Sequence, residues 1–133
     1  MISILVTVIL ASQTYEDLHN VKLVRVYDGD TIIVNIPHEP RLFGEQRGVR
    51  IRGIDTPEMH DPRLLVRAKA IYAKKVVEQK LKTAKRIDLT ETGREKYDRI
   101  LARVVADGVD ISDLLLKRGL AKPYNGGRKD QNW

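Results

Sequence analysis

Hydrophobic and polar residues alternate along several short stretches of the chain, which is the pattern of half-buried strands. Five such runs lie at residues 21–26, 31–36, 49–54, 86–90 and 100–105. Asp28-Gly29 is a tight-turn signal between the first two runs, so they should pair as a hairpin, and Pro37 should end the second strand. Residues 40–48 indicate a surface loop before the third strand, and the polar residues 91–99 separate the last two strands.

A longer segment has apolar residues at helical spacing. The positions, three and four apart, are Leu65, Ala68, Tyr72 and Val76. Pro62 suits the first turn of this helix, Asp61 precedes it, and the helix should end near Leu81. A second, shorter helix should begin in the 110–113 region and stop at Gly119, which favours a left-handed C-terminal cap.

The order of these elements predicts the fold class. Three strands, a helix, two strands and a helix are typical of an OB-type barrel, in which closure of the sheet leaves few exposed edges. We therefore expect a mainly β fold with α, a five-stranded OB-fold barrel with two to three helices. At 133 residues the chain has the size of one domain with one core, so we expect one active site.

The chain begins with an apolar run over residues 2–11 that is too short to span a bilayer. This run resembles the hydrophobic part of a secretory signal peptide, although no Lys or Arg precedes it. A buried first strand is the alternative, because every second residue from Ile4 to Leu10 is apolar. We expect a signal peptide over 1–12, a mobile lead-in over 13–20 and the domain over 21–133. The processed protein would be secreted or periplasmic, without stable membrane association.

Charge and residue types narrow the function. Lys and Arg number 24 against 18 Asp and Glu, so the surface should attract polyanions, with nucleic acid the leading partner. Such a surplus also occurs in ordinary soluble proteins and does not identify a ligand. The absence of cysteine excludes disulfides, thiolate metal sites and cysteine nucleophiles. His19, His38 and His60 lack the spacing of metal ligands, and there is no Ser-His-Asp elbow.

Two acidic motifs are candidates for a metal site. Asp28-Gly29-Asp30-Thr31 places carboxylates on a turn, and hard oxygen ligands of this kind suit Ca²⁺ or Mg²⁺. The same Asp-Gly pair is also a common hairpin turn with no ligand. Asp55-Thr56-Pro57-Glu58 follows the third strand, where proline restricts the chain and directs the side chains. A capped loop before the helix is the alternative explanation of this second motif.

Two basic motifs accompany the acidic ones. Arg50 and Arg52 should share one face of the third strand, although an arginine so close to Asp55 could simply pair with it. Lys96-Tyr97-Asp98-Arg99 leads into the fifth strand, where an exposed hairpin tip is the ordinary explanation. Each motif is weak by itself, and the information lies in their combination.

The order of the motifs resembles that of the staphylococcal nuclease (thermonuclease) family, over residues 21 to about 124. The matching motifs are Asp28-Gly29-Asp30-Thr31, Arg50, Asp55-Thr56-Pro57-Glu58, Lys96-Tyr97-x-Arg99 and Gly119-Leu120-Ala121. The resemblance implies that Asp30 and Asp55 are ligands of Ca²⁺, and that the Thr56 carbonyl is a third ligand. A divalent ion held in this way would neutralise a phosphodiester and activate water.

The same resemblance assigns residues to the substrate. Arg50 and Arg99 match the arginines that bind the phosphate, and Glu58 matches the carboxylate beside the attacking water. Further matches are Asp28 near the metal, Lys96 and Tyr97 at a terminal phosphate, and Tyr124, across a gap, as a base-stacking tyrosine. Asp98 stands where the best-known member has glycine, which puts a negative charge beside the phosphate site.

The resemblance implies a function as well as a site. Such a protein would be a monomeric, calcium-dependent phosphodiesterase that hydrolyses DNA and RNA, favours single strands and leaves 3′-phosphate ends. The main alternative is a catalytically inactive nuclease-like module that binds nucleic acid, because OB folds serve binding as readily as hydrolysis. Such a module should have lost a metal carboxylate or an arginine, whereas this chain keeps all of them. A basic protein that merely coats DNA would need no carboxylate cluster.

Overall fold

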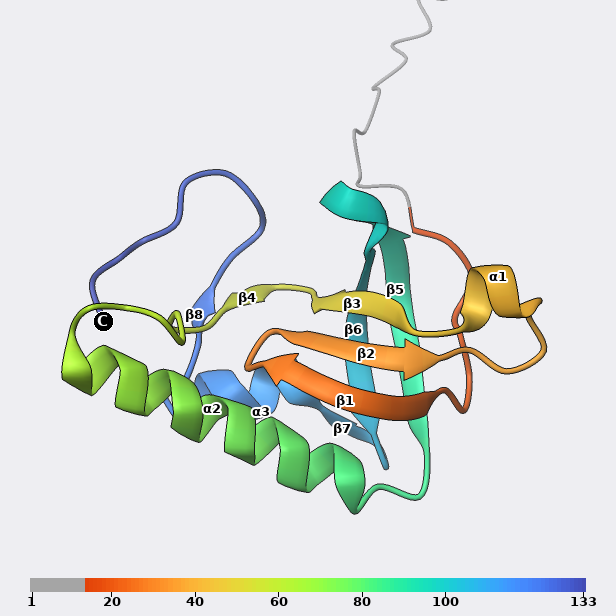
Figure 1. Ribbon diagram of the computed structural model, residues 1–133, viewed down its shortest axis with the longest axis horizontal. Helices are drawn as coiled ribbons and strands as arrows, with labels where there is room; N and C mark the ends of the chain where they lie inside the picture. Colours follow the sequence, from red (N-terminus) through yellow and green to blue (C-terminus); the bar gives the residue numbers. More distant parts are fainter. Residues whose placement is uncertain (1–13) are drawn as a thin grey trace, which may run out of the picture.

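A mixed sheet curved into a half-barrel forms the centre of the computed structural model, which describes residues 14–133 (Figure 1). The strand order is β1-β2-β3-β6-β5; β3 and β6 are parallel, whereas the other pairs are antiparallel, including a short β7 on β6. The strands are β1 (Lys22–Asp28), β2 (Thr31–Asn35), β3 (Arg47–Ile51), β5 (Ile87–Arg94), β6 (Ile100–Ala106) and β7 (Val109–Asp110). The predicted fold class, mainly β with α and of OB type, is confirmed.

The β1–β2 hairpin turns where the sequence predicts it, with Asp28 paired to Thr31 across the turn. The third strand differs from its predicted bounds, because β3 ends at Ile51 and the chain then turns at Gly53, which has φ of +88°. A separate short strand, β4 (Ile54–Asp55), follows the turn and pairs with β8 (Lys122–Pro123). The turn therefore moves Asp55 off the main sheet and toward the C-terminal part of the chain.

Two predicted loops contain regular structure. A single helical turn, α1 (Arg41–Gly44), lies within residues 40–48. The polar stretch 91–99 is partly strand, because β5 runs to Arg94 with a register shift after Thr90. A 3₁₀ turn, η1 (Lys96–Asp98), then leads into β6. The polar residues of this stretch predicted a break between strands, but a strand with one solvent-exposed face also carries polar residues.

The long helix α2 (Leu64–Lys82) crosses the sheet beside β1, as Figure 1 shows. Pro62 precedes the helix, so its predicted place in the first turn is wrong. The predicted apolar stripe is also largely wrong, since Leu65 is 84% exposed and Tyr72 is 55% exposed. The buried stripe consists instead of Val66, Ala70, Ala73, Val76, Val77 and Leu81. The helix has apolar residues on more than one side, so periodicity alone could not identify the side that meets the sheet.

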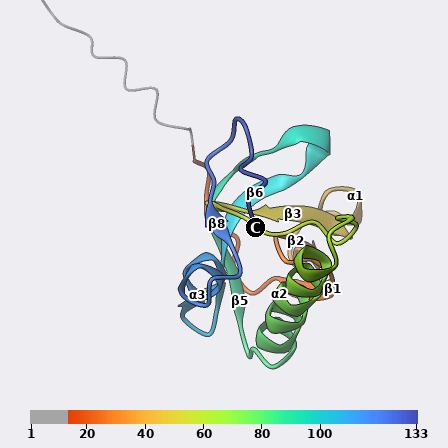
Figure 2. The same ribbon diagram turned by 90° about the vertical axis from the view of Figure 1, so that its left-hand side faces the viewer.

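The short helix α3 (Ile111–Lys117) begins and ends as predicted. The Asp110 carboxylate accepts a hydrogen bond from the Asp113 N–H at 3.1 Å, and Gly119 follows the helix with φ of +67°. The views in Figures 1 and 2 place α2 and α3 on the same side of the sheet. Ile111 and Leu115 are fully buried there in one continuous core with the strand residues Ile32, Val49 and Val104.

The lead-in from residue 14 runs along β5, where Tyr15 and Leu18 make single bridges to Thr92 and Leu89. The predicted signal peptide over residues 1–12 lies outside the described residues. Within residues 14–133, no helix combines the length and the apolar character that crossing a membrane requires.

Candidate active site

One buried guanidinium links the two acidic motifs. The Nη2 atom of Arg50, on β3, lies 3.5 Å from Oδ2 of Asp30 and 3.6 Å from Oδ1 of Asp55. All three residues are at most 7% exposed. Burying one cation against two carboxylates is costly unless further partners compensate. The arrangement therefore indicates a site built for chemistry rather than for stability alone.

The Asp30 carboxylate is held in place by the residue that follows Asp55. Thr56 donates its backbone N–H and its hydroxyl to Oδ2 of Asp30, at 3.2 and 3.0 Å. Gly29 permits this close approach, since a Cβ atom there would lie 3.0 Å from the Thr56 side chain. The Asp30 N–H in turn donates to Oδ1 of Asp28 at 3.0 Å. The glycine of the Asp-Gly-Asp-Thr motif is thus required for packing as well as for the turn.

The carboxyl groups of this cluster perturb one another. Burial, together with the neighbouring charge of Asp30, raises the pKa of Asp28 to about 7. Burial alone would also raise the pKa of Asp30, but Arg50 and the hydrogen bonds from Asp28 and Thr56 keep it below its ordinary value. Burial raises the pKa of Asp55, and the nearby cations offset only part of this effect. Concentrated negative charge of this kind favours a bound cation.

The oxygen donors fit a hard divalent ion. Among residues 14–133, no three His, Cys, Asp or Glu side chains form a metal cluster. The motif residues that could hold an ion are Asp30, Asp55 and the Thr56 carbonyl, and water would have to complete its coordination. Oδ1 of Asp55 is buried and faces two cations, Nζ of Lys129 at 3.2 Å and Nη2 of Arg50 at 3.6 Å, so positive charge is favoured at this oxygen.

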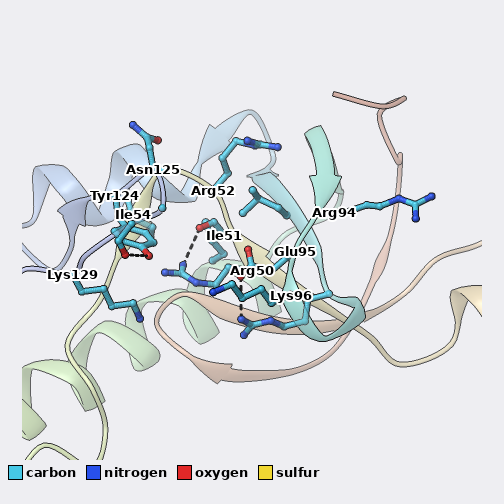
Figure 3. A pocket seen from close by; sticks show the side chains of 15 residues that line it. Arg50, Ile51, Arg52, Ile54, Arg94, Glu95, Lys96, Tyr124, Asn125 and Lys129 are labelled. Carbon is cyan, nitrogen blue, oxygen red and sulfur yellow. Dashed lines mark hydrogen bonds and ion pairs between the residues drawn. The ribbon is translucent and has the colours of Figure 1, made fainter. Parts of the chain in front are cut away.

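A cavity of about 650 Å³ opens beside Arg50. Figure 3 shows Arg50 between Tyr124 and Lys129 on one side and Glu95 and Lys96 on the other. Arg99 also lines the cavity, and its stem passes Gly48, where a Cβ atom would lie 3.3 Å from Cγ of Arg99. Six of the fifteen lining residues are arginine or lysine and one, Glu95, is acidic, so the cavity suits an anion.

Three buried side-chain atoms in the described part of the chain lack a hydrogen-bond partner. They are Nη2 of Arg50, Oδ1 of Asp55 and Nε of Arg99. All three belong to residues that the sequence motifs single out. Two of them lie in ion pairs, because Nη2 of Arg50 faces Asp30 and Asp55, and Oδ1 of Asp55 also faces Lys129. Buried polar groups are normally paired, so Nε of Arg99 is the donor among the three that is left for a polar ligand.

Comparison with known proteins agrees with this geometry. The pattern of the family described as "Staphylococcal nuclease homologue" matches residues 48–132. The chain belongs to this family. It is 35% identical to "Endonuclease YncB" of Bacillus subtilis over 84% of its length, and 33% identical to "Thermonuclease" of Staphylococcus hyicus over 76%. It spans only about half the length of these relatives, covering 51% of the first and 57% of the second.

Several predicted site residues of this nuclease homologue lie away from the buried cluster. The Glu58 side chain is 60% exposed on the loop after β4. Tyr97 is 90% exposed with φ of +61°, and it does not line the cavity, although its neighbour Lys96 does. Asp98 has φ of +60°, a conformation that glycine adopts without strain. The Tyr124 ring centroid lies 5.8 Å from the Arg50 guanidinium. Tyr124, which matches the family only across a gap, therefore has its ring beside the site.

Lys129 is the site residue that sequence reasoning missed in this nuclease homologue. Its Nζ lies 3.2 Å from Oδ1 of Asp55 and 3.7 Å from Oε1 of Glu58. Burial alone would lower the pKa of Lys129, but the charge of Asp55 outweighs it and the pKa is raised. Lys129 comes from a polar, glycine-containing tail that has neither periodicity nor a motif, so no signal in the sequence indicated it.

Proposed function

We propose that this staphylococcal nuclease homologue is a calcium-dependent phosphodiesterase that hydrolyses DNA and RNA and leaves 3′-phosphate ends. The observation that carries the proposal is the buried Arg50, which pairs with Asp30 and Asp55 and lines a cavity that also contains Arg99. Endonuclease and thermonuclease activities, which the names of the relatives state, fit such a cavity.

Each site residue has a distinct task in this mechanism. Asp30 and Asp55 would hold Ca²⁺, which when bound would neutralise phosphate charge and lower the pKa of a water molecule. Arg50 and Arg99 would donate hydrogen bonds to the phosphate oxygens, whose charge increases as water attacks phosphorus. Glu58 would accept or direct the proton of that water. Nε of Arg99, which is buried and makes no hydrogen bond among the described residues, supports this role for Arg99.

The residues around the cavity support a nucleic-acid substrate. Lys96 is available to a terminal phosphate, and the exposed Tyr97 ring lies next to it in η1. Tyr124 offers a ring against which an unpaired base could stack, which favours single-stranded substrates. We also propose that the protein acts outside the cytoplasm, on the basis of the apolar run over residues 2–11. That it acts as a monomer is proposed from the family resemblance.

Digestion of labelled oligonucleotides tests the proposed function. Purified protein should degrade single-stranded DNA and RNA with Ca²⁺ and stop when a chelator is added, and end-group analysis should find 3′-phosphates. Asp30→Asn keeps the shape of the ligand and removes its charge, so it should need more Ca²⁺ for half-maximal activity. Binding of the oligonucleotide without any cleavage would instead identify an inactive binding module, and undiminished cleavage in chelator would reject the metal.

A further inference from the structure

The last ten residues form a strap across the candidate active site. This C-terminal strap (residues 124–133) leaves β8 and returns to the start of α2, as Figure 1 shows. At one end the Tyr124 N–H donates to the Gly53 carbonyl at 3.0 Å. At the other end Arg63 donates to the Gln131 carbonyl at 3.0 Å, and the Trp133 ring lies against Lys69 and Lys122. The strap is therefore anchored on both sides of the site.

A tight turn inside the strap directs the chain back over the carboxylates. Gly126 and Gly127 have φ of +93° and +83°, which glycine adopts without strain. The Tyr124 hydroxyl closes the turn by donating to the Gly127 carbonyl at 2.9 Å. The residues after the turn then approach β4 and the loop that carries Glu58. The change of direction at Gly126 and Gly127 therefore brings Lys129 to the site.

Glu58 is more exposed than the other carboxylates of the site and has fewer contacts. Asp30 and Asp55 are buried, whereas the Glu58 side chain is 60% exposed. Within residues 14–133, its only side-chain ion pair is the one with Lys129 at 3.7 Å, and its carboxylate accepts no hydrogen bond. The same ammonium lies 3.2 Å from Asp55. Lys129 is therefore the one described contact that links Glu58 to the buried cluster.

We propose that Lys129 is a positioning residue for hydrolysis, whose ammonium holds Glu58 beside Asp55 in the orientation that receives the proton of the attacking water. This inference rests on the proposed function. An exposed glutamate without a partner samples several rotamers, and a fixed partner raises the fraction that is correctly placed. The strap is thereby part of the reaction machinery and not only a cover for the barrel.

Kinetics of Lys129→Met tests the proposal, because methionine keeps the stem and removes the charge. At saturating Ca²⁺ and single-stranded DNA, kcat should fall about 10–100-fold, the usual loss when a supporting partner of a site group is removed, with little change in KM. Lys129→Arg should recover most of the loss.

Arg128→Met is the matched control, since it removes one charge from the exposed neighbouring position and should leave kcat unchanged. An unchanged or higher kcat in Lys129→Met, with activation at lower Ca²⁺, would overturn the proposal and identify Lys129 as a tethered competitor of the metal.

Combination with Glu58→Gln separates positioning from a general structural role. If Lys129 acts through Glu58, adding Lys129→Met to Glu58→Gln should lower kcat by less than about threefold further, because the two losses are coupled. Independent, multiplying losses would reject this link.

A measurement without substrate distinguishes failure of the inference from failure of the proposed function. Carbon-13 relaxation at the Glu58 side chain should report restricted motion in the wild-type protein and greater motion in Lys129→Met, but not in Arg128→Met. Equal mobility in all three proteins would overturn the proposal. Absence of cleavage by the wild-type protein would count against the proposed function, while the relaxation result would still decide whether Lys129 orders Glu58.

Discussion

Arg99 makes fewer contacts than the other arginine of the site. Its Nη2 lies 3.3 Å from Oε1 of Glu95, its side chain is 32% exposed, and its buried Nε has no hydrogen-bond partner. Arg50, by contrast, is fixed between two buried carboxylates. A group with a free, preoriented donor can respond to charge that develops during reaction. Arg99 can therefore be changed with little structural consequence, which makes it the better kinetic probe.

Arg99→Lys should lower kcat by about 10²–10³, because lysine keeps the charge but loses the planar pair of donors. The melting temperature and the Ca²⁺ dependence should stay near the wild-type values, since the one ion pair of Arg99 within residues 14–133 is the partly exposed one with Glu95. Steady-state kinetics on single-stranded DNA measures the effect. Normal kcat with a raised KM would mean that Arg99 binds the substrate but does not stabilise the transition state.

Asp98→Gly should improve substrate binding. The side chain of Asp98 is 95% exposed beside the cationic cavity, and its φ of +60° is a conformation that glycine adopts more easily. Removing the carboxylate takes away its repulsion of phosphate, so KM should fall at low salt and the gain should shrink as salt is added. Asp98→Asn, which keeps the size and removes the charge, is the control for the backbone effect. An unchanged KM in both variants would contradict an influence of Asp98 on the substrate.

The β1–β2 turn and β4 are the elements that carry Asp30 and Asp55, the proposed metal ligands. Gly29→Ala should disturb them, because the new Cβ would lie 3.0 Å from Thr56 and 3.1 Å from Cβ of Ala73. Overpacking of this kind costs about 1–3 kcal/mol of stability. Displacement of Asp30 should also raise the Ca²⁺ concentration needed for half-maximal activity. Urea unfolding and calcium titration measure the two effects, and wild-type values in both would show that the turn tolerates a side chain.

A hydrogen-bonded salt bridge between Asp61 and Arg63 lies just before the N-terminus of α2. Arg63 donates its backbone N–H and two side-chain N–H groups to Asp61, at 2.9 to 3.0 Å, and these bonds lower the pKa of Asp61 to about 2 from an ordinary value of 3.8. The unfolded chain therefore binds more protons between these values. The stabilisation from Asp61 is present above about pH 4 and is lost as the pH falls toward 2.

Asp61→Asn should remove this part of the acid sensitivity. The free energy of unfolding of the wild-type protein, measured by urea between pH 5 and 2, should fall more steeply with decreasing pH than that of the variant. The two curves should differ most above pH 4 and converge at the acid end. Parallel curves would mean that the contact with Arg63 contributes nothing to the folded state.

At the scale of the whole molecule, metal binding and folding should be linked. Asp30 lies between β1 and β2, and Asp55 on β4, so the two ligands meet only in the folded chain. Ca²⁺ at about 100 times its dissociation constant should stabilise the fold by about 2.7 kcal/mol. Calorimetry should find a rise in melting temperature that a chelator reverses and that Asp30→Asn weakens. A melting temperature independent of Ca²⁺ would contradict the ligand set.

The sequence by itself determined the β1–β2 hairpin and the approximate positions of five strands. The Asp-Gly turn before Thr31 is local chemistry, so it needs no distant contacts. The motifs in their fixed order then indicated the family. Arg50 faces Asp30 because β2 and β3 pair, whereas Asp55 reaches Arg50 through the turn at Gly53, which the sequence did not indicate.

Only the tertiary structure decided which side of α2 is buried and which cation lies beside Glu58. Leu65 and Val66 are both apolar, but Leu65 lies in solvent and Val66 is buried, because the side that is buried depends on how the helix docks. Lys129 is distant from Asp55 in sequence and reaches it through a turn at Gly126-Gly127. Contacts of this kind arise from the path of the chain through space, which no local pattern of residues encodes.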